Sequence, residues 1–120
     1  MMKFLATAVI ALLIASGSVK ADDTQNWKQL NGEQIKQALE GASLVYPKEG
    51  GATQDFKPNG STTYVEGRPS LGEWKVSGKQ YCSSWPPAAG WVCYDVSIND
   101  DRSAVRFIGE SGRIYEGEFK

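Results

Sequence analysis

The spacing of hydrophobic and polar residues first predicts a short helix. Asn31 is a suitable N-cap, and Gln34, three residues later, completes a capping box. Leu30 and Ile35 occupy the positions of a hydrophobic staple, and Gly41 is placed to end the helix. Apolar residues within this segment recur at spacings of three and four, which is typical of a helix that packs one face against the rest of its domain. A helix this short is marginal alone, so it must dock to persist.

Beyond Ala42 the hydrophobic period falls to two, which is typical of strands. Short apolar stretches recur about every ten residues between turns rich in Gly or Asn, a pattern that indicates an antiparallel meander. The expected strands are residues 43–47, 53–58 (a brief edge strand), 61–67, 72–78, 80–85, 91–98, 104–108 and 113–119. The pattern predicts a mainly β fold, a small meander barrel of six to eight strands with the short N-terminal helix across an end or a face. The core candidates are Trp74, Val76, Val105, Phe107, Tyr115 and Phe119, with Leu44, Tyr46 and Tyr64 as weaker ones.

The first 21 residues have the pattern of a secretory signal peptide. Lys3 supplies the charged start, residues 4–15 form an apolar run, and Val19-Lys20-Ala21 is a small-residue exit. The run is short for a membrane span, which needs roughly 20 residues, although an uncleaved anchor is the alternative. The cleavage site has no Cys, so a lipoprotein signal is not indicated.

These features give the expected domain organisation. Residues 1–21 are removed, residues 22–29 form a flexible lead-in, and residues 30–120 form a single helix-plus-β-barrel domain. We expect a periplasmic or secreted protein with no membrane span in its mature form.

Composition narrows the function classes. The mature chain carries 11 Lys or Arg and 14 Asp or Glu, a net charge of 11 − 14 = −3. This balance argues against a nucleic-acid partner. The whole sequence contains no His, which excludes every mechanism that needs imidazole. We expect no cofactor.

The two cysteines, Cys82 and Cys93, are expected to form a disulfide because the chain is destined for an oxidising compartment. A catalytic thiol would lack its usual base, and a zinc site would lack ligands. If the two cysteines lie directly opposite each other, residues 86–89 form the turn of a hairpin. Its core face then carries Tyr81, Ser83, Trp85, Val92, Tyr94, Val96 and Ile98. The disulfide would lie on the outer face and contribute about 3 kcal/mol, but a register shift of one residue would reverse the faces.

From Leu30 to its end the chain resembles a family of small secreted alphaproteobacterial proteins of unknown function. The features that carry the resemblance are a Gly-x-Trp-x-Val strand and a Trp-containing turn bracketed by two cysteines, here Gly72, Trp74, Val76, Cys82, Trp85 and Cys93. The resemblance implies an extracytoplasmic, lipocalin-like β-barrel. It implies no activity, because no catalytic residues are assigned to that family.

Two groups of acidic residues are candidates for chemistry, and each has a simpler explanation. Glu116 and Glu118 lie two apart on one strand face, as a glycosidase pair could, but strand alternation places them on the solvent side. Asn99, Asp100 and Asp101 lack the spacing of a calcium loop and are better explained as the cap of a hairpin bend. We therefore assign no catalytic, cofactor-binding or metal-binding residues.

The segment from Trp85 to Trp91 is the candidate contact loop. Trp85, Pro86, Pro87 and Trp91 form a stiff, uncharged tip with a disulfide at its base. A rigid aromatic tip loses little entropy when it docks on a partner. The alternative is structural: Trp85 plugs the end of the barrel and Trp91 packs beside the disulfide.

The sequence leaves several functions open. The first is a non-catalytic binding module for a small apolar ligand inside the barrel or for an envelope protein or glycan at its rim. The second is an interaction role such as inhibition of a lysozyme-like or other enzyme. An enzyme that uses Asp or Glu alone is the third, and catalysis without histidine is uncommon. The ligand, the oligomeric state and the closure of the barrel are not determined at this level.

Overall fold

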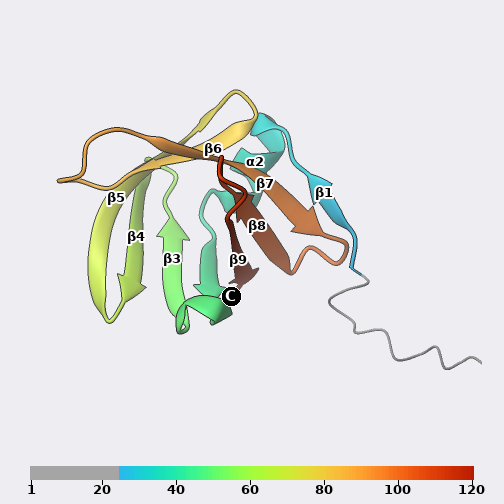
Figure 1. Ribbon diagram of the computed structural model, residues 1–120, viewed down its shortest axis with the longest axis horizontal. Coiled ribbons are helices and arrows are strands. Elements are labelled where there is room, and N and C mark those ends of the chain that lie inside the picture. The colour runs from blue at the N-terminus through green and yellow to red at the C-terminus, as the bar shows by residue number, and fades with distance from the viewer. Residues whose placement is uncertain (1–24) are drawn as a thin grey trace, which may run out of the picture.

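Eight consecutive antiparallel strands wind into a barrel in the part of the chain that the computed structural model describes, residues 25–120 (Figure 1). The predicted signal peptide lies outside these residues. The barrel strands are β2 (Ser43–Tyr46), β3 (Ala52–Phe56), β4 (Ser61–Glu66), β5 (Arg68–Ser77), β6 (Gln80–Ser84), β7 (Val92–Asn99), β8 (Ala104–Ile108) and β9 (Ile114–Phe119). The remaining elements are β1 (Trp27–Gln29), the helix α2 (Gly32–Leu39) and a 3₁₀ turn, η2 (Pro47–Glu49).

The barrel is closed because its first strand pairs with its last. β2 pairs with β9 through Leu44 and Phe119, while every other neighbour in the barrel is consecutive in sequence. β3, expected at an edge, pairs on both sides, with β2 and with β4. The fold class is thus confirmed, and the architecture is compatible with a lipocalin-like barrel. Closure leaves the barrel without a free edge, the usual site of aberrant pairing.

The last three residues of the expected lead-in form a strand instead. β1 pairs with the end of β7, with Trp27 opposite Asn99 and Gln29 opposite Ser97. Ser97 also pairs with Arg106 of β8, so β1 and β8 lie on opposite edges of β7. The segment is therefore anchored, and the Arg106 guanidinium lies 3.9 Å from the centroid of the Trp27 ring.

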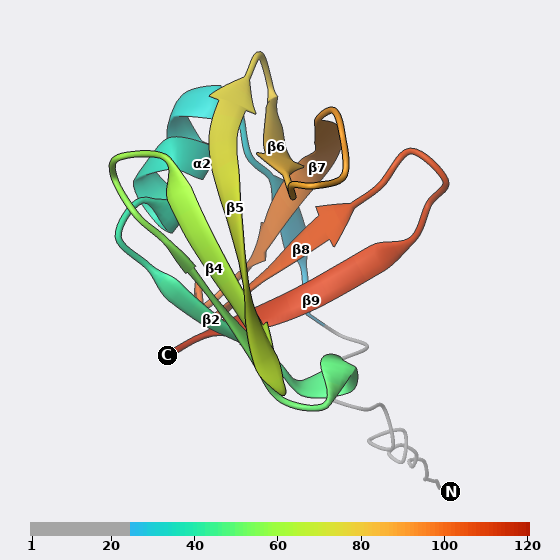
Figure 2. The ribbon, with the colours of Figure 1, turned by 90° about the vertical axis from the view of Figure 1, so that its left-hand side faces the viewer.

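The helix α2 packs beside the turn between β5 and β6 and seals one end of the barrel (Figure 2). Its capping box is present: Asn31 Oδ1 accepts from the Gln34 amide at 2.9 Å, and Gln34 Oε1 accepts from the Asn31 amide at 2.9 Å. Ile35 and Leu39 are fully buried. A Cβ on Gly32 would lie 2.2 Å from the Gly78 carbonyl oxygen, so only glycine allows this close approach.

Successive turns of the barrel alternate between its two ends. The closed end is formed by α2 with the turns at residues 57–60, 78–79 and 100–103; the open end is formed by the connections at residues 47–51, 67, 85–91 and 109–113. The core cluster consists of Leu30, Ile35, Leu39, Leu44, Tyr46, Phe56, Trp74, Tyr81, Val96, Ile98, Val105 and Phe107. Its aliphatic members thus come from α2 and its flanking segments and from the inner faces of the strands.

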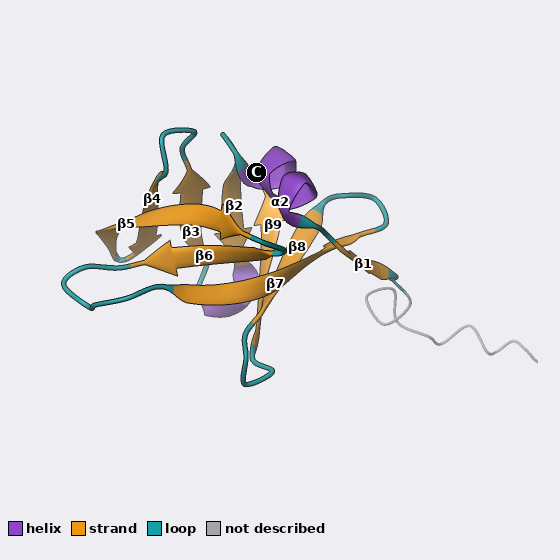
Figure 3. Cartoon of the chain, turned by 90° about the horizontal axis from the view of Figure 1, so that it is seen from above, coloured by secondary structure: helices purple, strands orange, loops and turns teal. Residues whose placement is uncertain are grey.

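The hairpin of β6 and β7 has the expected register, with Cys82 opposite Cys93 and Tyr81 opposite Tyr94. Pairing nevertheless stops at Ser83 and Val92, so the connection is longer than the expected four-residue turn. Figure 3 shows this loop projecting from the barrel. Val92, expected on the core face, is exposed, because it lies at the rim where the barrel interior ends.

Candidate functional site

A cavity of about 250 Å³ lies at the open end of the barrel. The residues that line it come from η2, from seven of the eight barrel strands and from the start of the β6–β7 loop. They are Tyr46, Glu49, Gln54, Tyr64, Tyr81, Ser83, Trp85, Tyr94, Phe107 and Tyr115. All five tyrosines of the chain are among them, and no lining residue is aliphatic. We call this space the aromatic cavity.

The base of the aromatic cavity is a buried hydrogen-bond network centred on Gln54. The Tyr46 hydroxyl donates to Gln54 Oε1 at 2.6 Å. Gln54 Nε2 donates to Thr62 Oγ1 at 3.0 Å and to the Tyr81 hydroxyl oxygen at 3.2 Å. Thr62 Oγ1 in turn donates to the backbone carbonyl of Asp55. Because both amide hydrogens of Gln54 are used, its burial leaves no donor unsatisfied, and the base of the cavity is rigid.

The walls are aromatic rings in edge-to-face and tilted contact. The ring centroids of Tyr64 and Trp85 are 6.3 Å apart, and those of Tyr94 and Tyr115 are 6.2 Å apart. Such pairs hold one another in fixed orientations. A neighbouring glycine makes room for one of them: a Cβ on Gly72 would lie 2.6 Å from Trp85 Cε3. The absence of a side chain at Gly72 thus lets the indole of Trp85 pack against the backbone of β5.

The mouth of the cavity carries charges of both signs on different sides. Glu49 lines the cavity, and the Tyr64 hydroxyl donates to Glu66 Oε1 at 2.8 Å. The Arg113 guanidinium lies 4.8 Å from the centroid of the Tyr115 ring. Two carboxylates therefore stand near Tyr64, and one guanidinium stands near Tyr115.

Four of the five phenols have raised pKa values. Burial raises the pKa of Tyr46 far above its usual range and raises that of Tyr81 to about 12, although the polar groups of Ser83 and Gln54 act against the latter shift. Burial, and then the hydrogen bond to Glu66, raise the pKa of Tyr64 to about 12. Burial also raises the pKa of Tyr94. These four hydroxyls are therefore neutral at physiological pH.

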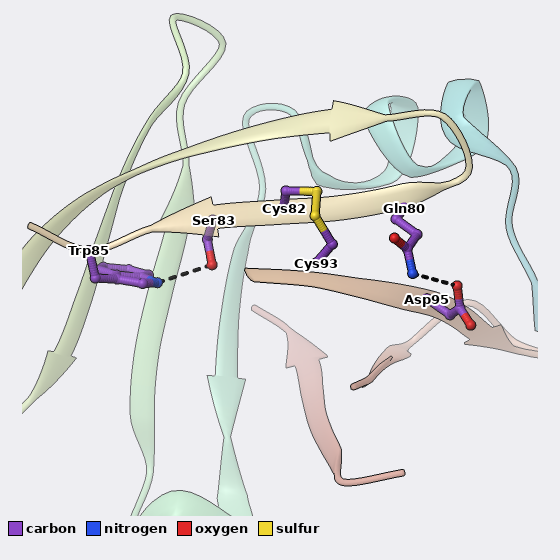
Figure 4. The surroundings of a disulfide bond; sticks show 6 residues. All are labelled: Gln80, Cys82, Ser83, Trp85, Cys93 and Asp95. Atoms are coloured by element: carbon purple, nitrogen blue, oxygen red, sulfur yellow. Dashed lines mark hydrogen bonds between the residues drawn. A yellow bond between two sulfur atoms is a disulfide. The ribbon is translucent and has the colours of Figure 1, made fainter. Parts of the chain in front are cut away.

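The predicted disulfide is confirmed and lies on the outer face of the hairpin that forms one wall of the cavity. Figure 4 shows Cys82 joined to Cys93 across β6 and β7, at an S–S distance of 2.02 Å. Gln80 Nε2 donates to Asp95 Oδ1 at 3.2 Å further along the same pair of strands. The indole nitrogen of Trp85 donates to Ser83 Oγ at 3.0 Å at the other end (Figure 4). The bridge thus ties together the two strands that carry Tyr81 and Tyr94.

The structure divides the candidate contact loop between two surfaces. Trp85 is half-buried and lines the aromatic cavity, whereas Pro86 and Pro87 are exposed. Trp91 lies on the outer surface, where 41% of it is exposed and Lys75 Nζ is 4.1 Å from its ring centroid. The role of this loop as a contact surface stays a prediction, but its two tryptophans face different environments.

The acidic candidates lie apart from the cavity. Glu116 forms an ion pair with Arg106 at 3.0 Å, and Glu118 is exposed on the outside of β9. Asn99 Oδ1 accepts from the amides of Ser103 and Ala104, so the expected hairpin cap is present. Within residues 25–120 no cluster of three or more acidic or Cys side chains could hold a metal ion. No helix among the described residues has the length and hydrophobicity of a membrane-spanning segment.

The sequence analysis did not identify the aromatic cavity, although a signal for it was present. Four aromatic residues each lie within three residues of a turn, and the turns concerned are every second one along the chain. These residues are Tyr46, Tyr64, Trp85 and Tyr115. In an up-and-down barrel alternate turns share one end. A Tyr or Trp beside each of the four open-end turns therefore indicates an aromatic mouth, although Phe56 and Tyr81 lie as close to turns of the closed end.

Comparisons of the chain with protein-family models, with curated proteins and with solved structures found no match. The resemblance to the alphaproteobacterial family of unknown function accordingly stays a prediction, and the functional argument rests on the cavity itself.

Proposed function

We propose that this protein is a non-catalytic binding module that holds one small, ring-sized molecule in the aromatic cavity. The observation that carries the proposal is the gathering of all five tyrosines and Trp85 around one space open to solvent. Pockets that combine aromatic walls with a few polar groups are the usual sites for small ligands.

The volume limits the size of that occupant. A closed cavity of roughly 150 Å³ accepts benzene, whereas drug-sized ligands use roughly 300 Å³ or more. At about 250 Å³, the aromatic cavity suits a molecule of one ring or of similar bulk. The lining also carries the Glu49 carboxylate and the hydroxyls of Tyr94 and Tyr115, which favours a ligand with one polar or charged group over the wholly apolar ligand expected from the sequence.

The proposal of a non-catalytic role is supported by the ionisable groups. Glu49 is the only carboxylate among the lining residues, and the chain contains no His. General acid–base catalysis needs groups whose pKa values lie near the working pH, and the buried phenols are shifted away from it. The proposed place of action is the periplasm or the extracellular medium, which the disulfide and the N-terminal signal pattern support.

A pair of variants on adjacent residues of β6 tests this function. Ser83→Leu fills the cavity from its wall, whereas Ser84→Leu adds the same volume to the outer face. Phenol, indole and benzyl alcohol serve as probes, and binding is followed by chemical-shift changes and by thermal stabilisation. We expect binding to the original protein and to Ser84→Leu, and loss of binding in Ser83→Leu. Equal binding by both variants, or no binding of any probe to the original protein, would contradict the proposal.

A second candidate function is inhibition of, or docking onto, another protein. The observation that favours it is the position of the exposed large hydrophobic residues of the described chain, which all lie in the open-end half. They are Val65, Leu71 (71% exposed), Trp91, Val92 and Ile114. Apolar groups around a rim are typical of an interaction surface. If the protein has this role, lysozyme-like enzymes should turn over more slowly at micromolar concentrations of the protein. The inhibition should be lost when Leu71 and Trp91 are both changed to Ser.

A further inference from the structure

The charges around the aromatic cavity are unequally distributed. Glu49 is the only lining residue with a formal charge at neutral pH, and no Lys or Arg is among them. A second carboxylate, Glu66, is held at the mouth by the hydroxyl of Tyr64. The lining therefore offers a negative group and neutral π systems to a ligand, with no cation of its own.

Most polar groups of the lining are already occupied. Gln54 uses both amide hydrogens within the base network, Ser83 Oγ accepts from Trp85, and the Tyr64 hydroxyl donates to Glu66. A sugar ring needs several free donors and acceptors around its edge, because each of its hydroxyls would otherwise be buried without a partner. The other polar groups of the lining are the Glu49 carboxylate and the Tyr94 and Tyr115 hydroxyls, and the rest of the lining consists mainly of aromatic rings, which have little hydrogen-bonding capacity.

Ring faces attract cations through their quadrupole, and the mouth contains an example. Arg113 stands 4.8 Å from the centroid of the Tyr115 ring, which is within the usual range of a cation–π contact. Several rings around one space form an aromatic cage, the arrangement that recognises alkylated ammonium groups. Such a cation fits the volume, needs no hydrogen bonds and is attracted by a nearby carboxylate.

We infer that the ligand of the aromatic cavity is a small organic cation that carries an alkylated ammonium group. Tyr46, Tyr64, Trp85 and Tyr115 supply the cage, and Glu49 supplies the opposite charge. The inference rests on the proposed function and specifies the class of its ligand. Arg113 repels the ligand at the mouth and therefore limits its affinity.

A matched pair of probes separates charge from shape. Choline carries a trimethylammonium group, and its uncharged carbon isostere carries a tert-butyl group in the same position. We expect isothermal calorimetry and chemical-shift titration to show that choline binds about tenfold more tightly than the isostere, a typical gain for a desolvated cation–π contact. Equal affinities would overturn the cation inference and leave the proposed function intact, whereas failure of both probes and of the ring probes above would overturn both.

Charge variants test the sign of the interaction. Glu49→Gln is expected to weaken choline binding about fivefold and Arg113→Gln to strengthen it by a similar factor, the size of a partly screened ion pair. Glu118→Gln removes the same charge from the outer face of β9 and serves as the control, with unchanged affinity expected. The isostere should respond to none of the three, and circular dichroism checks that each variant folds. Stronger choline binding by Glu49→Gln together with weaker binding by Arg113→Gln would indicate an anionic ligand and overturn the inference.

The ammonium group could belong to a free molecule or to a choline lipid headgroup. Co-sedimentation with phosphatidylcholine vesicles, compared with phosphatidylglycerol vesicles, distinguishes these sources. Choline binding together with selective capture on phosphatidylcholine supports a headgroup, and choline binding without capture supports a free cation. Absence of both choline binding and capture overturns the inference.

Discussion

The two ends of the barrel are built from the same strands but from different side chains. At the closed end Ile35 and Leu39 of α2 pack onto the inner faces of the strands, where Phe56 and Trp74 meet edge to face with centroids 5.7 Å apart. At the open end tyrosines replace aliphatic residues, and the helical structure there, within residues 25–120, is limited to the three-residue 3₁₀ turn η2. The closed end therefore excludes water, whereas the open end holds a space bounded by rings and hydroxyls.

This difference shows how a small domain can accommodate a cavity. A domain of this size has little apolar surface to bury, so empty space close to its main core would remove much of its net stability. Here the residues of α2 that belong to the core lie at one end of the barrel axis and the mouth of the cavity at the other, while Tyr46, Tyr81 and Phe107 belong to both the core cluster and the cavity lining. The disulfide and the Gln54 network strengthen the open end. Stability and binding are thus separated at the two ends of the axis and share residues in the middle of the barrel.

The largest expected effect comes from truncation at the closed end. Phe56 contacts the rings of Trp74, Tyr81 and Phe107, and its side chain is almost completely buried. Phe56→Ala should lower the free energy of unfolding by about 3–5 kcal/mol, because a cavity replaces a packed ring. Tyr115→Ala at the open end is the matched change, with a loss of about 1–2 kcal/mol expected. Urea denaturation measures both, and equal losses would contradict the proposed division between the ends.

Loss of the disulfide should come next in size. The bridge joins residues that are 11 apart in sequence. Replacing both cysteines by Ser should lower the free energy of unfolding by about 3 kcal/mol, since the unfolded chain regains the freedom of the closed loop. Thermal denaturation of the oxidised protein, the reduced protein and the double variant provides the measurement. If the bridge supports mainly the open end, binding of the ring probes should fall at temperatures where the far-UV spectrum is still native.

Alkaline pH should destabilise the fold through the buried tyrosines that line the cavity. The folded-state pKa values of Tyr46 and Tyr81 lie above the usual value of 10, so folding favours the neutral phenols. Their contribution to stability is complete below pH 10 and is lost as the pH rises toward and beyond 12. At pH 11 we expect a loss of about 2–3 kcal/mol from this pair by proton linkage. Near-UV absorbance should show the tyrosinates of Tyr46 and Tyr81 forming together with unfolding; ionisation of these two phenols near pH 10 in the folded state would contradict this expectation.

The smallest effect concerns the hydrogen-bond network below the cavity. Gln54→Leu keeps the approximate shape but leaves the Tyr46 hydroxyl without its acceptor and removes the donor to Thr62 and Tyr81. The expected loss is about 2 kcal/mol, the size of a desolvated polar group left unpaired. Gln37→Leu on the exposed face of α2 serves as the control, with a change of about 0.5 kcal/mol or less. Urea denaturation of both variants decides whether the network stabilises the fold.

Local patterns predicted much of this fold because they reflect local physics. The capping box of Asn31 and Gln34 involves neighbours in sequence, and alternation identified Trp74, Val105 and Phe107 as buried. The hairpin register followed from the pairing of Cys82 with Cys93. The pairing of β1 with β7 was not predictable in this way, because a strand of three residues has no period and is stabilised by a distant partner. The packing of the Trp85 ring against β5 depends on the space left by Gly72, which is 13 positions away in sequence.

The candidate site was less predictable than the fold. Trp85 was predicted from the sequence to belong to a contact loop, whereas it forms part of the cavity wall. No pattern in the sequence distinguishes Gln54 from an exposed polar residue. Its burial is explained by its hydrogen bonds to Tyr46, Thr62 and Tyr81. These residues are separated by 8 to 27 positions from Gln54, so no short motif connects them.

The sequence by itself determined the class of the fold, the helix with its caps, the partner of each cysteine and the inward-facing positions of most strands. These properties arise from periodicity and from neighbours along the chain. Only the tertiary structure decided that the barrel closes, that the helix seals one end, and that five tyrosines scattered over five strands surround one cavity. Closure brings the first and last strands together and places every second turn at the same end, and no interaction between sequence neighbours encodes that arrangement.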